Sequence, residues 1–228
     1  MREIVIVDHP VFAEGLALFL RTELRAEAVS VHGDPARLAQ PRALVLVELL
    51  LPSDECGLTL ARRLQTARPD LTTVVWTSKP VPVSIWAAVE HKVPGFLDKQ
   101  MPLRDLRYWL EHALVQRAAW PGQLLEQARD WDREVAPRLA ALGHELWNLW
   151  ASLLRREKNG ELGARMGWSP RTLERRLSEL YTALGVQGRA DAISVGWEWG
   201  LVHQHESRVE WNPFIRDLFK SQANHRAA

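Results

Sequence analysis

The sequence predicts an α/β N-terminal domain with a doubly wound, five-stranded parallel sheet, followed by an all-α C-terminal domain of four helices. Over the first hundred-odd residues, five short apolar runs rich in Val, Ile and Leu alternate with stretches of helical length. This alternation is typical of a parallel sheet covered by helices. Residues 159–186 then have the pattern of two short helices joined by a tight turn. With 228 residues and 46% hydrophobic content, the chain is long and apolar enough for two cores.

The predicted strands are β-branched or apolar runs of ordinary strand length. They cover residues 3–8, 28–33, 43–50, 71–78 and 95–99. Helical patterns follow them at residues 12–24, 34–40, 57–67, 82–92 and 103–117. Because the carboxyl ends of parallel strands meet at one edge of a sheet, functional residues are expected there. Asp8, Glu48, Thr77 and Lys99 stand at these ends, so the sequence predicts a site that handles a cation or a phosphate.

Residues 119–142 predict a structured connection between the two domains. A helical pattern covers residues 122–136. Its apolar face consists of Leu124, Leu125, Ala128, Trp131 and Val135. A flexible linker would instead be rich in glycine and serine. We therefore expect a helix that either couples the domains or the protomers, or simply covers a domain edge.

Residues 159–186 contain the signals that begin and end two helices. Leu162 and Met166 share one face of the first helix, and Gly167 suits the left-handed conformation that ends it. Ser169 and Pro170 begin the second, since serine caps free N–H groups and proline suits the first helical position. Its apolar stripe and final glycine are Leu173, Leu177, Leu180, Tyr181, Leu184 and Gly185. The opposite face is either free to enter the major groove of DNA or the solvated side of an ordinary helical hairpin.

This stretch resembles the C-terminal helix-turn-helix of the LuxR/NarL family of transcription regulators. The matching residues are Asn159, Glu161, Leu162, Met166, Gly167, Ser169, Thr172, Leu173, Leu184, Gly185 and Val186, then Arg189 to Ala192, and Gly200 and Leu201. The resemblance implies a transcription regulator whose partner is double-stranded promoter DNA.

The candidate DNA contacts lie on and around the second helix of the stretch. They are Arg165, Ser169, Arg171, Thr172, Glu174, Arg175, Arg176 and Ser178. Ser169 and Thr172 are placed to bind phosphates beside the helix N-terminus. Arg175 and Arg176 can reach base edges, where bidentate contacts with guanine discriminate between bases. Glu174 stands where the family has a lysine that contacts DNA, so the family's usual site preference is not carried over.

The first half resembles the receiver domain of two-component response regulators, from about Arg2 to Arg117. The segments VDHPVFAEGL and GFLDK carry the resemblance, together with Pro52 and Gly57. It implies roles for the candidate residues: Asp8 is the metal-side acid, Thr77 the switch hydroxyl, Phe96 the switch aromatic and Lys99 the partner of the phosphoryl group.

Two departures from the receiver pattern argue against phosphorylation. Receivers begin with two adjacent acids, and Val7 replaces the first, so at most weak Mg²⁺ binding is expected at Asp8 and Glu48. Glu48 replaces the phospho-acceptor aspartate, and its extra methylene displaces the nucleophilic oxygen. Two interpretations of Glu48 remain open. Its carboxylate either imitates the phosphorylated state through Lys99 or Thr77, or is the remnant of a lost site, paired with Lys99 to avoid an unpaired buried charge.

The eleven tryptophans are unusual, and most are expected in the cores. Trp86 and Trp109 are instead candidate anchors of a homodimer interface. The tail beyond the family's usual end contains WNPFIRDLFK, which predicts a helix that begins at Asn212-Pro213. Its apolar face consists of Phe214, Ile215, Leu218 and Phe219.

The sequence therefore predicts an atypical, orphan-type response regulator that acts without conventional phosphorylation, for which a cognate histidine kinase is doubtful. The predicted parts are residues 1–118 (receiver-like), 119–142 (helical linker), 143–202 (helix-turn-helix) and 203–228 (C-terminal extension). A receiver that senses a protein or small ligand and controls a weak DNA-binding output is the alternative; a conventional phosphorelay regulator is a third. The single cysteine, Cys56, predicts a reducing compartment and therefore a cytoplasmic protein. No apolar run is long enough to span a membrane, so no membrane segment is expected. The sequence contains no catalytic motif, and we expect neither enzyme activity nor a cofactor.

Overall fold

The computed structural model describes residues 3–23, 25–30, 35–51, 55–205, 208–212 and 215. It divides into two compact units, Met1–Pro80 with Ser84–Ala128, and Arg129–Ala228 with Val81–Val83. Several sequence-based expectations concern residues outside the described ones: residues 31–34, Pro52, Phe214, Leu218 and Phe219.

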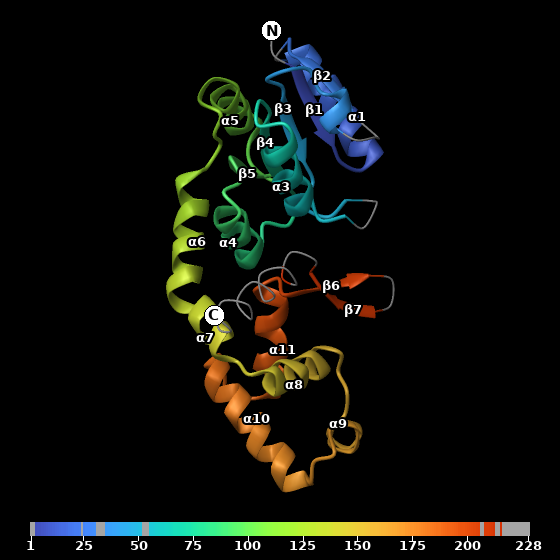
Figure 1. Ribbon diagram of the computed structural model, residues 1–228, viewed down its shortest axis with the longest axis vertical. Coiled ribbons are helices and arrows are strands. Elements are labelled where there is room, and N and C mark those ends of the chain that lie inside the picture. The colour runs from blue at the N-terminus through green and yellow to red at the C-terminus, as the bar shows by residue number, and fades with distance from the viewer. Residues whose placement is uncertain are drawn as a thin grey trace. The chain divides into compact units, whose positions relative to one another are not determined.

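The first unit contains one parallel sheet of five strands (Figure 1). The strands are β1 (Glu3–Val7), β2 (Glu27–Ser30), β3 (Leu44–Val47), β4 (Thr72–Thr77) and β5 (Gly95–Asp98). The helices are α1 (Pro10–Glu23), α2 (Pro35–Leu38), α3 (Gly57–Ala67), α4 (Pro82–Glu90) and α5 (Leu103–Gln116). The order β2-β1-β3-β4-β5 confirms the predicted doubly wound α/β fold. It reverses between β1 and β3, where ligand sites of such sheets form.

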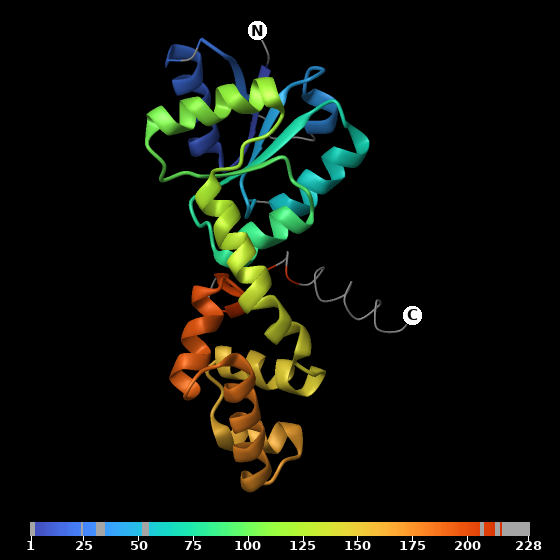
Figure 2. The same cartoon turned by 90° about the vertical axis from the view of Figure 1, so that its left-hand side faces the viewer.

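The helices cover both faces of this sheet (Figure 2). On one face, α1 and α5 pack on alternate strand residues, such as Ile4, Leu46 and Trp76. On the other face, α3 packs on the residues between them, such as Val5 and Val45. Alternation of this kind follows from the two-residue period of a strand. It leaves only the ends of the strands for polar residues.

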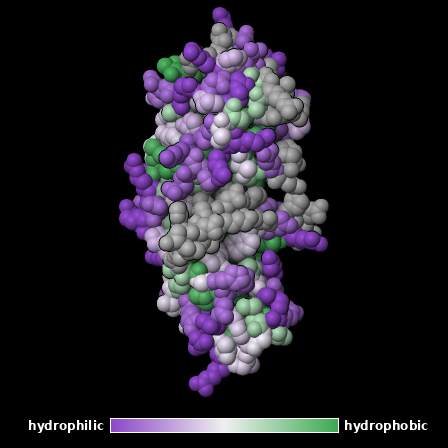
Figure 3. Space-filling model, in the orientation of Figure 1, coloured by the Kyte–Doolittle hydropathy of each residue, from purple (hydrophilic) through white to green (hydrophobic). Residues whose placement is uncertain are grey.

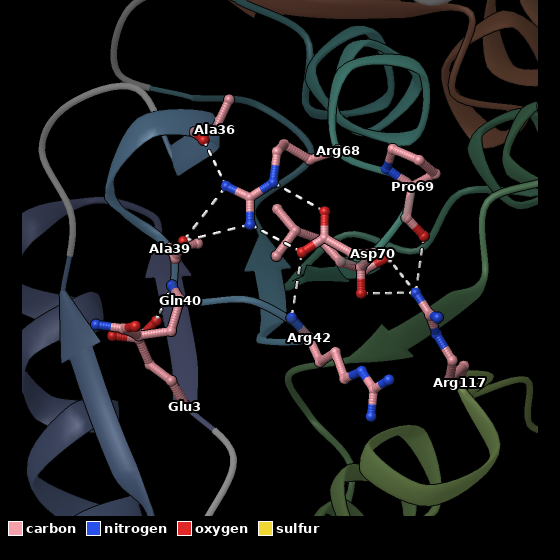
Figure 4. Close-up of polar contacts among 10 residues, drawn as sticks. Glu3, Ala36, Ala39, Gln40, Arg42, Arg68, Pro69, Asp70 and Arg117 are labelled. Atoms are coloured by element: carbon pink, nitrogen blue, oxygen red, sulfur yellow. Dashed lines mark hydrogen bonds and ion pairs between the residues drawn. The ribbon is translucent and has the colours of Figure 1, made fainter.

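Arginine side chains form hydrogen bonds with neighbouring loops at the amino end of the sheet (Figure 4). Arg68 donates two hydrogen bonds of 2.8 Å to Asp70 and one of 2.7 Å to the Ala36 carbonyl. Asp70 also accepts from the Arg42 N–H at 3.2 Å, and Arg117 donates to the Asp70 carbonyl at 2.7 Å. The hydrogen bonds from Arg68 hold the pKa of Asp70 far below its usual range. The carboxylate therefore stays charged, and its contribution to stability is lost only as the pH falls through that depressed pKa.

The second unit contains the four predicted helices of the C-terminal domain, the short helix α7 before them and the last part of α6, which begins in the first unit. The helices are α6 (Gly122–Glu134), α7 (Ala136–Ala141), α8 (His144–Leu154), α9 (Asn159–Met166), α10 (Pro170–Leu184) and α11 (Arg189–Glu198). An antiparallel pair, β6 (Val202–His205) and β7 (Arg208–Trp211), follows them. The sequence analysis did not predict this hairpin. Its strands are short, and the expected helix began only at Asn212.

The helix predicted at residues 122–136 is confirmed as α6, and Leu124, Ala128 and Trp131 on its apolar face are buried. Tryptophans pack together in the second unit. The indole of Trp150 is fully buried and donates to the Ala192 carbonyl at 2.7 Å. Ring centroids of Trp147, Trp199 and Trp211 lie 5.5, 6.1 and 6.4 Å from it, and Trp131 lies 5.6 Å from Trp199. These five residues, the tryptophan cluster, join α6, α8, α11 and β7 into one core.

Trp86 and Trp109 were expected to anchor an interface. Trp86 on α4 is only 7% exposed, so it is unavailable as a surface anchor in this conformation. Trp109 on α5 is half-buried and contacts Tyr108 and His112 edge-on, at 5.1 and 5.6 Å between ring centroids. Among the described residues, no helix is both long and apolar enough to span a membrane.

Candidate functional site

Three charged residues predicted from the strand ends meet at the carboxyl edge of the sheet. Asp8 follows β1, Glu48 follows β3 and Lys99 follows β5. The Lys99 ammonium lies 2.5 Å from Asp8 Oδ2 and 2.5 Å from Glu48 Oε2. All three are largely buried, and the Lys99 side chain is only 10% exposed. The three residues form an ion triad in which two carboxylates share one cation.

Backbone N–H groups complete the hydrogen bonding of the two carboxylates in the triad. Asp8 Oδ1 accepts a hydrogen bond of 2.6 Å from the His9 N–H, and Glu48 Oε1 one of 2.6 Å from the Leu49 N–H. Each of the four carboxylate oxygens therefore already has a donor. Hydrogen bonds of this kind compensate buried charges for the loss of water.

Two aromatic rings flank the ammonium group of Lys99. The ring centroids of Trp76 on β4 and Phe12 on α1 lie 4.9 and 5.1 Å from its nitrogen. A cation at these distances from aromatic faces is attracted by the ring electrons. The cation is thus held by two carboxylates and two rings. The sequence analysis did not identify Phe12 or Trp76 as part of the site, because nothing in their spacing distinguishes them from core residues.

Thr77 and Phe96 lie in neighbouring strands but make other contacts. Thr77 is buried, and its hydroxyl oxygen accepts a hydrogen bond of 3.2 Å from the Lys79 N–H. Phe96 is fully buried and stacks on Trp120, with 6.2 Å between ring centroids. The structure therefore brings together Asp8, Glu48 and Lys99 and gives the two other candidates separate partners.

Receivers of this fold hold Mg²⁺ through acidic side chains, and the residues present here do not fit that ion. Val7 offers no oxygen from its side chain, and the Lys99 ammonium occupies the space between Asp8 and Glu48. A divalent cation would have to displace this ammonium group before it met two carboxylates. Hard cations need several oxygen ligands, and this donor set is already used by a lysine.

Gly57 is the receiver-pattern glycine whose role the structure explains. Its N–H donates to the Leu49 carbonyl at 2.8 Å, which joins the start of α3 to the loop after Glu48. A Cβ added to Gly57 would lie 2.1 Å from the Glu48 carbonyl oxygen, closer than atoms can approach. Only glycine permits this approach, which keeps Glu48 in place.

The two helices predicted at residues 159–186 are α9 and α10. Gly167 ends α9 with φ 67°, and Gly185 ends α10 with φ 72°, both in the left-handed region. Ser169 caps α10, because its hydroxyl oxygen accepts the Thr172 N–H at 3.2 Å, and Pro170 is the first residue of the helix. Leu173 and the other leucines of the stripe are buried. The local signals of the sequence thus form the predicted helix-turn-helix.

The arginines of α10 differ in how far they are available to a ligand. Arg171 is exposed. The Arg175 side chain is 59% exposed and pairs with Glu179. Arg176 is 29% exposed and pairs with Glu179 at 2.9 Å and with Glu145 of α8 at 2.8 Å. Hydrophilic residues are mixed with near-neutral and hydrophobic ones on the face of this unit that Figure 3 shows.

Arg176 also lies over the Trp168 ring, 6.0 Å from its centroid. Three further candidate DNA contacts lie on α9 and α10. Glu174 and Ser178 are exposed on α10. Arg165 of α9 pairs with Glu157 at 3.0 Å and donates to the Ser152 hydroxyl. Sequence reasoning missed Glu179 and Glu145. Glu179 could have been found, because it follows Arg175 and Arg176 by four and three residues, the spacing of helical ion pairs.

Solved structures of response regulators share the fold of the chain. RcsB bound to DNA is 19% identical, with a TM-score of 0.57 over 85% of this chain and 96% of that chain. RcsB of Salmonella enterica serovar Typhimurium, bound to a promoter with phosphomimetic BeF3⁻, is 19% identical, with a TM-score of 0.58 over 85% and 96%. The response regulator ChrA of a heme-sensing two-component system is 26% identical, with a TM-score of 0.50 over 86% and 96%.

A curated relative also matches part of the chain. It is the methanol utilization control regulatory protein MoxX of Paracoccus denitrificans, 30% identical over 109 residues. The match covers 45% of this chain and 48% of that protein, so the chain spans about half the length of this relative. No family model matches the chain.

Proposed function

We propose that the protein is a DNA-binding transcription regulator of the response-regulator type that works without aspartyl phosphorylation. It binds double-stranded promoter DNA as a homodimer in the cytoplasm. We assign residues 1–118 to a receiver-like domain, 119–142 to a linker, 143–202 to the DNA-binding domain and 203–228 to an extension. The observation that carries this proposal is the ion triad, in which Lys99 already holds the two carboxylates that phosphorylation would need.

The triad is compatible with both interpretations of Glu48, as an imitation of the phosphorylated state and as the remnant of a lost site. Its carboxylate reaches Lys99, the residue that resemblance assigns to the phosphoryl group, at 2.5 Å, which both interpretations expect. The Thr77 hydroxyl accepts a hydrogen bond from the Lys79 N–H instead. An imitation of the phosphorylated state would thus use the lysine contact and not the hydroxyl contact.

Incubation with acetyl phosphate and Mg²⁺ is expected to leave the protein unlabelled. Glu48 is an extended nucleophile whose two oxygens already accept hydrogen bonds, and the metal site is incompatible with the residues present. Phos-tag electrophoresis checks this, with a conventional receiver labelled in parallel as the positive control. Stoichiometric acid-labile phosphate on Glu48 would contradict the proposal.

Arg171 and Arg175 are the arginines we assign to DNA, since both are exposed on α10. Arg176 we assign to the interior of the domain, because Glu145, Glu179 and Trp168 surround its guanidinium group. The N-terminus of α10 adds N–H groups and a partial positive charge for a phosphate.

Arg175→Ala is expected to weaken binding to selected genomic fragments by roughly ten- to a hundredfold and to relax selectivity, as for loss of one base contact. Gel shifts with fragments selected by the parent protein measure this. Arg62→Ala, an exposed arginine of α3, is the matched control and should bind as the parent does. Unchanged selectivity in Arg175→Ala would exclude it as a base-reading residue.

A second candidate function is a receiver that responds to a bound protein. Large apolar side chains are exposed on α1 and α5 of the first unit. They are Val11, Phe12, Leu18, Leu103, Tyr108 and Val115. Exposed apolar residues gathered on two helices favour a protein-binding surface. The same surface also supports the homodimer, so this observation is compatible with both functions.

A further inference from the structure

Glu179 holds two arginines of the proposed DNA-binding helix. Its Oε1 accepts from Arg175 and its Oε2 accepts from Arg176 at 2.9 Å. The spacings are four and three residues, so all three side chains lie on neighbouring turns of α10. Both oxygens of one carboxylate are therefore directed at the guanidinium groups that a DNA backbone would attract.

The charge of α10 is low for a helix that contacts DNA. It carries three arginines (Arg171, Arg175 and Arg176) and two glutamates (Glu174 and Glu179), which leaves a net charge of +1. Affinity for the DNA backbone depends on how many phosphates the protein neutralises. An arginine that remains paired with a carboxylate does not neutralise a phosphate.

Glu179 remains charged while it holds these arginines. The hydrogen bond from Arg176 and the charges of Arg175 and Arg176 hold the pKa of Glu179 below its ordinary value. Arg176 has a second carboxylate partner in Glu145, whereas Arg175 is paired with Glu179 alone among the described ion pairs. Arg175 is thus the cation that the loss of Glu179 would release.

We propose that Glu179 competes with DNA for Arg175, whose guanidinium group pairs with a phosphate on non-specific DNA and with a base edge on a specific site, and thereby sets the affinity of α10 for DNA. This inference depends on the proposed DNA-binding function. Exposed ion pairs are weak, so a DNA phosphate can displace Glu179 from Arg175. This displacement breaks the ion pair and brings the phosphate close to the negative charge of the Glu179 carboxylate, and both effects lower the affinity for DNA. The Arg175–Glu179 pair thus keeps the affinity for non-specific DNA low. Binding is tight only at sites where base contacts compensate for the loss of this ion pair.

The test compares Glu179→Ala with Glu126→Ala, a substitution on α6 outside the proposed DNA interface. Each removes one negative charge, but the described residues include no ion pair of Glu126, so only the first releases an arginine. Binding to a mixed-sequence duplex is measured by fluorescence anisotropy between low and physiological salt, with helicity checked by circular dichroism. Glu179→Ala is expected to bind several-fold more tightly, with a log K against log salt slope steeper by about one, as for one additional phosphate contact.

The outcomes separate the inference from the function on which it depends. Glu126→Ala should keep the parent's slope, because it adds no phosphate contact. An unchanged slope in Glu179→Ala, with the parent bound, would overturn the inference and leave the DNA-binding function intact. Binding by Glu179→Ala where the parent does not bind would support it. No salt-dependent binding by any of the three proteins would overturn both.

Discussion

Replacing Lys99 with methionine is expected to lower the free energy of unfolding of the first unit by about 3–5 kcal/mol. The substitution keeps most of the apolar stem but removes the only cation between Asp8 and Glu48 in the described structure. Two buried carboxylates, at 5% and 7% residue exposure, would then face each other without a cation between them. Urea unfolding followed by tryptophan fluorescence measures this, because Trp76 lies beside the Lys99 nitrogen.

Two comparisons separate the charge from the packing of Lys99. The triple variant with Asp8→Asn and Glu48→Gln in addition to Lys99→Met should recover part of the lost stability, since it removes both uncompensated charges. Lys79→Met is the control, because Lys79 is exposed and its replacement should change stability by no more than about 0.5 kcal/mol. If Lys99→Met proved as stable as the control, the triad would contribute little to stability, and the proposal that it blocks phosphorylation would lose its basis.

The architecture could be predicted because most of its signals are local. Runs such as residues 44–47 are buried on both sides, which a strand within a parallel sheet requires, and they contain little else but Val and Leu. The ends of α10 were predicted from Ser169, Pro170 and Gly185, whose effects on the backbone extend over only a few neighbouring residues. The hairpin of β6 and β7 could not be predicted in this way. Its stability depends on Trp211 packing against Trp147 and Trp150 of α8, far away in the sequence.

At the candidate site, the sequence predicted which residues meet but not the partners that each side chain selects. Strand ends identified Asp8, Glu48 and Lys99 as neighbours, and the topology brings them together. The same reasoning could not show that Phe96 stacks on Trp120, since a buried aromatic residue has several neighbours from which to choose. It also treated Arg175 and Arg176 alike. Their difference arises from Glu145 on α8, which reaches only Arg176 and can be located only in the folded chain.

Trp150→Ala is expected to lower the free energy of unfolding of the second unit by about 3–5 kcal/mol. Trp150 is fully buried at the centre of the tryptophan cluster, where its ring neighbours belong to α8, α11 and β7. No residue nearby can fill the space of an indole without moving one of these elements. Denaturant unfolding of the full chain measures the loss, with the first unit serving as an internal reference.

Trp150→Phe distinguishes the volume of the ring from its hydrogen bond. Phenylalanine keeps most of the packing but leaves the Ala192 carbonyl without the indole donor, a loss of about 1–3 kcal/mol. Hydrogen exchange then tests whether the cluster holds the hairpin to the helices. In Trp150→Ala, amides of β6 and β7 should lose protection more than those of α10, because Trp211 contacts Trp150 directly. Equal loss in the hairpin and in α10 would mean that the second unit unfolds as a whole. In that case the hairpin is a full part of the proposed DNA-binding domain, and the boundary of that domain lies beyond residue 202.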